Sequence, residues 1–177
     1  IPDTSIDYPV VQGNDDSYYL THTFKKAEHV AGAIFLDSDN NADFSDDKNI
    51  IYGHNMKDGS MFRGLRNFLD DEFLKEHHIL YLYLPDEGVW IFVIVKCEYT
   101  PADGDAFLLG TQEEVPTLLL STCGTDTSKR LVVWCERQEE NGEQIEYSDE
   151  ETEVQEATDD LAFLDGEFVE NETHDFI

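Results

Sequence analysis

Residues 118–133 read LLLSTCGTDTSKRLVV, and this stretch predicts two strands joined by a tight loop. Leu118–Thr122 is an apolar run too short for an ordinary helix, and Leu131–Trp134 is rich in the β-branched and aromatic residues that strands prefer. The residues between the two runs are small and polar, as in turns. Cys123 therefore stands where a strand ends, and Arg130 opens the returning strand, which brings it back toward the thiol.

A cysteine beside a permanent cation has the chemistry of a nucleophile. The positive charge favours the thiolate, which is the reactive form, and a guanidinium can also hold a substrate carbonyl or the oxyanion formed from it. Such a nucleophile needs a base as well. The candidate is His54, which follows another short apolar run in NIIYGHNM, residues 49–56. Two strand ends, one with Cys and one with His, predict a thiol–imidazole pair if the fold brings them together.

Taken together, these motifs resemble the sortase family, and within it class B. The resembling segments are STC, KRLVV and IYGHNM, preceded by DTSIDYPVVQGNDDSYYL and AGAIFLD, all within residues 1–137. Carried over residue by residue, the resemblance implies that Cys123 is the nucleophile, His54 its acid–base partner and Arg130 the third catalytic residue. It also implies a set of substrate-binding residues, with Ser121 at a position that contacts the sorting signal. This set comprises Ser121, Thr122 and Asn55.

The resemblance implies a cysteine transpeptidase of surface proteins. Cys123 would attack a Thr–Gly-type amide in a C-terminal sorting motif and form a thioacyl enzyme. His54 would protonate the leaving amine and later deprotonate the incoming one, which comes from peptidoglycan or from a pilin lysine. No metal or organic cofactor is needed. The implied location is the outer face of a Gram-positive membrane, and we interpret the start at Ile1, within a strand-like pattern, as a trimmed N-terminus lacking the anchor.

The resemblance implies a fold that is mainly β, a closed sortase-type β-barrel of about eight mostly antiparallel strands with a few short helices, followed here by an acidic C-terminal tail. About seven strand-like runs within residues 1–137 are consistent with this expectation. Among them, Ile79–Leu84 and Gly88–Tyr99 flank the turn sequence PDEG, which predicts a hairpin. Ile6–Val11 and Ala33–Leu36 are further strand candidates.

Helices are expected in only a few places. Met61–Leu69 and Asp71–His78 have helical spacing and predict helices that pack on the core. The connection Pro101–Pro116 has room for one short helical turn around Asp105–Leu109, where class B sortases usually carry a long helix.

Charge divides the chain into two parts. Residues 139–177 hold 16 of the 40 acidic residues and none of the 11 Lys and Arg, so residues 1–138 carry a net charge of −13. We therefore predict a catalytic domain over 1–138 and a flexible, solvated tail over 139–177, in which the apolar island Leu161–Leu164 leaves docking open as an alternative. The overall charge of −29 argues against nucleic-acid binding. The longest apolar run, Val89–Val95, is seven residues, far short of a membrane span.

Two local patterns have plain alternatives. Cys97 and Cys135 lie in apolar runs and are interpreted as buried inert thiols, the alternative being that they pair and leave Cys123 as the odd thiol. The loop that begins DSDNNAD at Asp37 looks like a calcium loop, but Ala42 stands where glycine is needed and Lys48 where glutamate is needed. A polar loop without metal is favoured there.

Two other functional classes are alternatives to the transpeptidase. A papain-like protease has its cysteine on a helix and its histidine downstream, whereas His54 precedes Cys123 here. A catalytically inactive sortase-like surface module that only binds remains the alternative. The complete set of Cys123, His54 and Arg130 argues against such a degenerate site.

Overall fold

Short apolar runs pair as strands and build one sheet around which the rest of the domain packs. The computed structural model describes residues 1–85, 88–123 (the side chain of Cys123 excepted) and 128–138, which belong to the unit Ile1–Glu139. In chain order, the elements are β1 (Val10–Gln12), η1 (Tyr18–Leu20), β2 (Ile34–Leu36), β3 (Lys48–Tyr52), η2 (Phe62–Leu69), α1 (Asp71–Glu76), β4 (Ile79–Leu84), β5 (Gly88–Pro101), η3 (Asp105–Phe107), β6 (Thr117–Cys123) and β7 (Lys129–Arg137), where η denotes a 3₁₀ helix.

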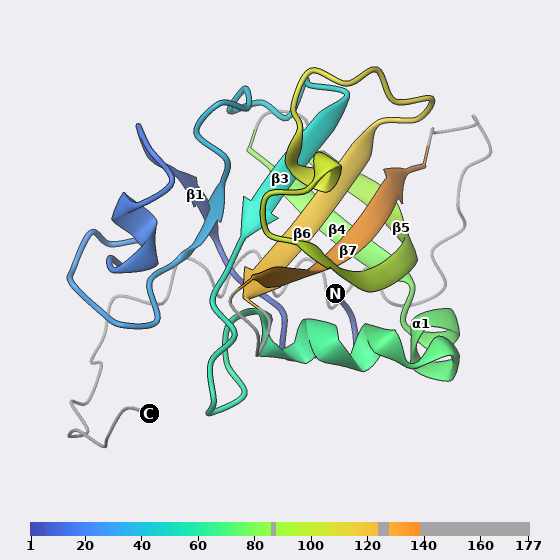
Figure 1. Cartoon of the computed structure of the whole chain (residues 1–177), viewed down its shortest axis with the longest axis horizontal. Helices are drawn as coiled ribbons and strands as arrows, with labels where there is room; N and C mark the ends of the chain where they lie inside the picture. Colours follow the sequence, from blue (N-terminus) through green and yellow to red (C-terminus); the bar gives the residue numbers. More distant parts are fainter. Residues whose placement is uncertain (86–87, 124–127, 139–177) are drawn as a thin grey trace. The chain divides into compact units, whose positions relative to one another are not determined.

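The sheet has the strand order β1-β2-β3-β6-β7-β5-β4 and curls into a half-barrel (Figure 1). The pairs β1–β2 and β3–β6 are parallel, and the other neighbours are antiparallel. The prediction of a mainly β fold with a few short helices is thereby confirmed. Within the described residues the sheet has seven strands and two edges, not eight strands in a closed ring. The ring stays open there because the edge strands β1 and β4 each pair on one side only, with β2 and β5.

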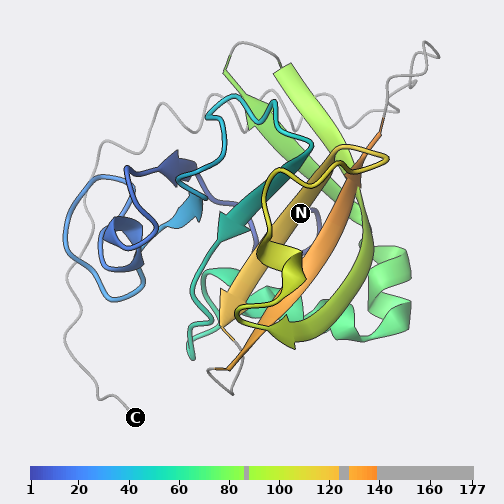
Figure 2. The same cartoon turned by 45° about the horizontal axis from the view of Figure 1, so that its top comes forward.

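The main core lies between the sheet and the helices η2 and α1, which run along one side of it in Figures 1 and 2. Phe62, Leu65 and Phe68 of η2 are buried in the same cluster as Leu120 of β6 and Val133 of β7. The helix α1 begins at a cap in which the Asp70 carboxylate accepts hydrogen bonds from the first turn, as short helices require. The two predicted packing helices are thus confirmed, the first as a 3₁₀ helix.

A second apolar cluster covers the opposite face of the central strands. Its fully buried members are Ile50 of β3, Leu119 of β6 and Val132 of β7. Ala106, Phe107 and Leu109 pack over them from the β5–β6 connection, residues 102–116, which contains the single turn η3. Because both faces of these strands are covered, they read in sequence as continuous apolar runs and not as alternating ones. The expected short turn around Asp105–Leu109 is confirmed.

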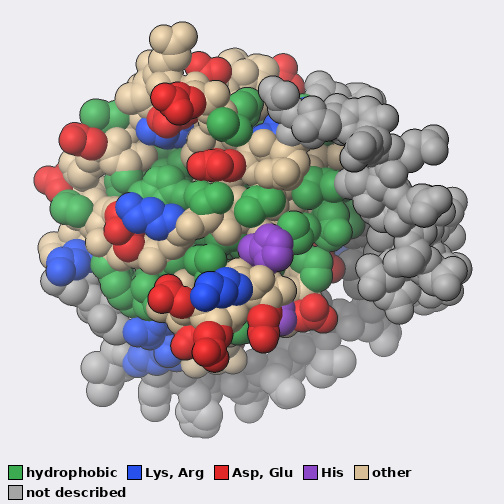
Figure 3. Space-filling model, turned by 90° about the vertical axis from the view of Figure 1, so that its right-hand side faces the viewer, with side chains coloured by type: hydrophobic (Ala, Val, Ile, Leu, Met, Phe, Trp, Pro, Cys, Tyr) green, Lys and Arg blue, Asp and Glu red, His purple; other side chains and the backbone are tan. Residues whose placement is uncertain are grey.

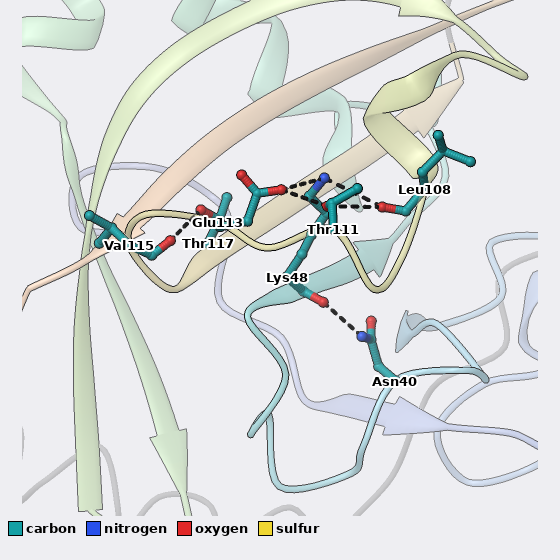
Figure 4. A network of polar contacts seen from close by, with 7 residues as sticks. All are labelled: Asn40, Lys48, Leu108, Thr111, Glu113, Val115 and Thr117. Atoms are coloured by element: carbon teal, nitrogen blue, oxygen red, sulfur yellow. Dashed lines mark hydrogen bonds and ion pairs between the residues drawn. The ribbon is translucent and has the colours of Figure 1, made fainter.

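One ion pair fastens the β5–β6 connection to β3 (Figure 4). The ammonium of Lys48, whose side chain is 9% exposed, lies 2.7 Å from the Glu113 carboxylate and donates to the Leu108 carbonyl at 3.4 Å. Thr111 donates a hydrogen bond of 2.7 Å to the same carboxylate. This network borders a polar cavity of about 540 Å³ at the beginning of β3, and not at the end that leads to His54.

The remaining local predictions have clear outcomes. Cys97 and Cys135 are free thiols, so the alternative in which they pair is wrong. Burial raises the pKa of both thiols, that of Cys97 to about 12, which favours the inert protonated form. In the loop after β2, the Asp46 carboxylate accepts hydrogen bonds from Asn40 and Asn41, so loop groups occupy its oxygens. The described part of the chain contains no cluster of three or more metal-ligating side chains.

The surface is mixed. The side of the domain drawn in Figure 3 shows hydrophobic side chains among acidic and basic ones. Exposed apolar side chains of β4 and β5 include Tyr83 and Val95. Among the helices that the structure describes, none has the length and apolar character needed to cross a membrane. The predicted tail, residues 139–177, lies outside the described residues, and its flexibility stays a prediction.

Candidate active site

The parallel pairing of β3 and β6 brings two predicted catalytic positions to the same end of the sheet. Tyr52 pairs with Ser121, and the Gly53 amide continues the ladder by donating to the Ser121 carbonyl at 3.1 Å. His54 and Cys123 follow two residues after this pair, one on each chain segment. The two parallel strands end at the same edge of the sheet, so the histidine and the cysteine follow at that edge although 69 positions separate them in sequence.

The third position comes from β7. In the antiparallel pair β6–β7, Cys123 is the direct partner of Arg130. The backbone positions of His54, Cys123 and Arg130 therefore follow one another across three neighbouring segments at one edge of the sheet. The structure brings the predicted trio together at the level of the backbone; the Cys123 side chain and residues 124–127 lie outside the described part.

The His54 ring is held by a backbone carbonyl from an early part of the chain. Its Nε2 lies 2.7 Å from the carbonyl oxygen of Leu20, at the end of η1. The His54 carbonyl accepts a hydrogen bond of 2.9 Å from the Phe62 amide, which fixes the turn after β3. Gly53 precedes the histidine because a Cβ there would lie 2.7 Å from the Phe62 ring and even closer to Ile34. Only a glycine allows the end of β3 to pass this close to η2.

A buried tyrosine–carboxylate pair lies beside the edge. Tyr52 Oη donates a hydrogen bond of 2.8 Å to Asp37, whose side chain is buried at the end of β2. Burial raises the pKa of Tyr52 strongly, and the hydrogen bond to Asp37 acts in the same direction. The positive charge of Arg130 acts in the opposite direction on this pKa. The tyrosine is therefore a neutral hydrogen-bond donor at neutral pH.

The predicted substrate-binding residues occupy different environments. Ser121 and Thr122 are 1% and 2% exposed, and their hydroxyls have no hydrogen-bond partner within the described residues. Ser121 lies on the face of β6 that carries Leu119, whereas Thr122 lies on the core face with Leu120. The Asn55 side chain accepts a hydrogen bond of 3.0 Å from Arg63. Their roles toward a substrate stay predictions.

Reasoning from sequence missed two groups at this edge. The Leu20 carbonyl is a backbone atom, so no residue type marks it, although the stretch Tyr18–Leu20 was part of the recognised N-terminal segment. The Asp37–Tyr52 bond joins the residue that follows β2 to a residue two positions before His54. The tyrosine two positions before His54 is the one sequence signal that could have pointed to this bond.

Comparisons with known proteins agree with this geometry. The family model of the sortase domain matches residues 1–138. Sortase B of Listeria monocytogenes is 54% identical over 77 residues, which are 44% of this chain and 31% of that protein's length. The crystal structure of Clostridium perfringens sortase B superposes with a TM-score of 0.69 at 26% identity, covering 78% of this chain and 91% of that one.

A further solved structure has a TM-score of 0.70 and is 25% identical, covering 78% of this chain and 88% of its own. It is a class B sortase of Streptococcus pyogenes involved in pilus biogenesis. The fold of this chain therefore agrees with the folds of these two sortases over most of the described domain. The mainly β fold is the sortase fold. Since the family model covers the whole predicted catalytic domain, this chain belongs to the sortase family of cysteine transpeptidases and is most similar in type to class B.

Proposed function

We propose that this chain is the catalytic domain of a class B-like sortase that transfers surface proteins from a C-terminal sorting motif to an amine acceptor. The observation that carries the proposal is the backbone register. Cys123 is paired with Arg130, and it follows Ser121 by two residues, as His54 follows Tyr52, the partner of Ser121. Residues directly opposite each other in an antiparallel pair share one face of the sheet, which supports a joint role of the cysteine and the arginine. Family membership supports the same reaction.

In the proposed reaction, the Cys123 thiolate attacks the carbonyl carbon of the scissile amide. Arg130 steadies the developing oxyanion. The C–N bond then breaks, His54 gives its proton to the leaving amine, and a thioacyl enzyme remains. An incoming amine displaces the thiolate after giving a proton back to His54.

The substrates are proposed as a class. The sorting motif is a short C-terminal peptide of a surface protein, and the acceptor is an amine of peptidoglycan or a pilin lysine. The Streptococcus pyogenes class B sortase, which is involved in pilus biogenesis, keeps the pilin acceptor among the candidates. We propose a location at the outer face of the cell membrane, as is typical of the family.

Mass spectrometry tests the proposal directly. The chain is incubated with LPXTG-like and NPXTN-like peptides, with and without an amine acceptor, and the mass of the intact protein is measured. We expect a thioacyl adduct with one of the motifs, which the acceptor then discharges as a ligated product. Cys123→Ala should abolish the adduct, whereas Cys97→Ala should keep it.

Two results would contradict the proposal. An adduct that survives in Cys123→Ala would move the nucleophile elsewhere. A folded wild-type chain that forms no adduct with any motif would favour the alternative of a binding module without catalysis.

A further inference from the structure

The contact between Leu20 and His54 fixes more than the position of the ring. A carbonyl oxygen can only accept a hydrogen bond, so the nitrogen 2.7 Å away must carry the hydrogen. In the neutral imidazole, this contact selects the tautomer with hydrogen on Nε2 and leaves Nδ1 as the acceptor. The ring nitrogen that is free to exchange a proton is therefore determined by a residue 34 positions earlier in the chain.

The Leu20 carbonyl is itself held rigidly. Tyr19, before it, is buried against Phe35, and its carbonyl accepts a hydrogen bond of 2.9 Å from the Ala33 amide. Thr21, after it, accepts a hydrogen bond of 2.8 Å from the His29 amide. The peptide that faces His54 is thus fixed on both sides by backbone hydrogen bonds.

Gly32 permits this arrangement. Its φ is +60°, in the region that favours glycine. A Cβ at this position would collide with the Tyr19 carbonyl and lie 2.8 Å from that of Leu20. The obstruction is backbone, which a rotamer change cannot relieve, so any side chain at 32 must displace the segment that contacts His54.

We propose that the Leu20 carbonyl, seated by the close packing of Gly32, is a positioning group that holds His54 with its hydrogen on Nε2, so that Nδ1 transfers the proton in the reaction. This inference rests on the proposed function. It adds that Nδ1 is the ring atom that transfers the proton and that Gly32 seats the carbonyl that selects this tautomer. Leu20 and Gly32 are positioning residues, since neither is required to touch the reacting atoms.

The proton balance follows from this assignment. In the first half, the Nδ1–H proton of the imidazolium goes to the nitrogen of the breaking amide, whose electron pair leaves with it, and Cys123 keeps the acyl group. The imidazole is then neutral, with hydrogen on Nε2 and the Leu20 bond intact. In the second half, Nδ1 takes a proton from the attacking amine as the C–S bond breaks, and the thiolate and imidazolium are restored.

The first experiment is nitrogen-15 NMR of the histidine rings in the full chain, at a pH about two units above the ordinary imidazole pKa of ~6.5. A His54→Gln variant assigns the signals of His54. We expect a neutral ring with an unprotonated Nδ1 and with a hydrogen on Nε2 that is protected from exchange with solvent. His78 is an internal control for the other tautomer, because its Nδ1 lies 2.7 Å from the Lys75 carbonyl and should carry the hydrogen.

The second experiment compares two alanine substitutions at glycines that both have a positive φ. Gly32→Ala adds the collision, whereas Gly88→Ala (φ +79°) has open space around its Cβ. We expect kcat of Gly32→Ala to fall by about 100-fold with KM changed less than about twofold, because the motif still binds while the acid is misplaced. The protected Nε2–H signal should be lost in Gly32→Ala and kept in Gly88→Ala.

The outcomes separate the two proposals. An Nδ1–H tautomer at His54, or a folded Gly32→Ala variant with unchanged kcat, would overturn the positioning role. If Gly32→Ala does not fold, the wild-type spectrum alone decides the tautomer. A wild-type chain with the expected tautomer but no thioacyl adduct would instead overturn the proposed function, and the proton-transfer role with it.

Discussion

Gly53 is the residue where packing and the candidate site meet most tightly. It lies between the last residue of β3 and His54, and a Cβ there would collide with Ile34 and the Phe62 ring. Gly53→Ala should therefore cost about 1–3 kcal/mol of unfolding free energy through overpacking. It should also lower kcat, because relief of the collision moves His54. Urea denaturation measures the stability, and peptide turnover measures the rate.

Gly64 of η2 is the matched control for this substitution. Its Cβ would meet Ile6 and Ser5 at 3.4–3.6 Å, which is ordinary contact. Gly64→Ala should leave the stability unchanged or raise it slightly, since alanine is the better helix former. If Gly53→Ala and Gly64→Ala changed the unfolding free energy equally, the collision at Gly53 would be relieved without cost.

Cys97, which is half-buried, and Cys135, which is buried, differ from Cys123 in predicted reactivity. Burial raises the pKa of Cys97 to about 12 and that of Cys135 further, so both stay protonated near neutral pH. In the Cys123→Ala variant we expect almost no alkylation by iodoacetamide at pH 8, with labelling of Cys97 rising only as the pH approaches its pKa. Intact mass measures the label. Rapid labelling of this folded variant at pH 8 would contradict the burial.

At the scale of residues, sequence predicted what residue types encode. A cysteine, a histidine and an arginine are visible by their letters, and their flanking motifs predicted positions at strand ends. Cys123 and Arg130 are paired where β6 ends and β7 begins, and His54 follows the end of β3 by two residues. The Leu20 carbonyl could not be found in that way, because every residue has a backbone carbonyl. Only the packing of the neighbouring residues brings this one to His54. Its position depends on Gly32, a residue whose role becomes visible only once φ and the nearby backbone are known.

At the scale of elements, the β5–β6 connection depends on one polar anchor. The Lys48–Glu113 pair, with side chains 9% and 29% exposed, ties residues 102–116 to the start of β3. In Glu113→Gln the buried ammonium loses its partner, so we expect a loss of about 2 kcal/mol, between the values typical of exposed and buried pairs. Thermal or urea unfolding at neutral pH measures it. Glu114→Gln, at an exposed neighbouring position, is the control and should change little.

The pH dependence of this pair has a defined sign. Hydrogen bonds from Lys48 and Thr111 lower the pKa of Glu113 below its ordinary value of 4.5. A carboxylate with a lowered folded pKa stabilises the fold above that ordinary value and loses its contribution as the pH falls through the folded pKa. The stability difference between wild type and Glu113→Gln should therefore be largest near neutral pH and shrink below about pH 4. A difference that persists in acid would point to packing instead of charge.

Elements were predicted with unequal success, for physical reasons. The hairpin β4–β5 was marked by its turn sequence, and η2 and α1 by helical spacing. The expected strand over Ile6–Val11 is shorter, Val10–Gln12, because Pro9 lacks an amide to donate and pairing begins only after it. The parallel pairing of β3 with β6 has no local sequence signal, since it joins runs more than 60 residues apart. That pairing creates the candidate site.

At the scale of the whole chain, the acidic C-terminal part raises the question of whether it affects the rate of transfer. Residues 139–177 carry 16 acidic residues and no Lys or Arg, outside the described residues. All the positions of the predicted trio, and the family match to residue 138, lie before them. The family model thus supports a catalytic domain that ends at Gln138, and the boundary itself stays a prediction.

We therefore expect a chain ending at Gln138 to transfer peptides at nearly the full-length rate. Like charges repel one another and favour a solvated segment, so the two rates should agree within about threefold at low and at high salt. The competing hypothesis is autoinhibition, in which acidic side chains fold over the Arg130 cation and occupy the place of a substrate. It predicts a large gain in rate on truncation, which shrinks at high salt because screening weakens exposed charge contacts. Such a salt-dependent gain would rule out an inert tail, whereas equal rates in both salts would rule out electrostatic autoinhibition.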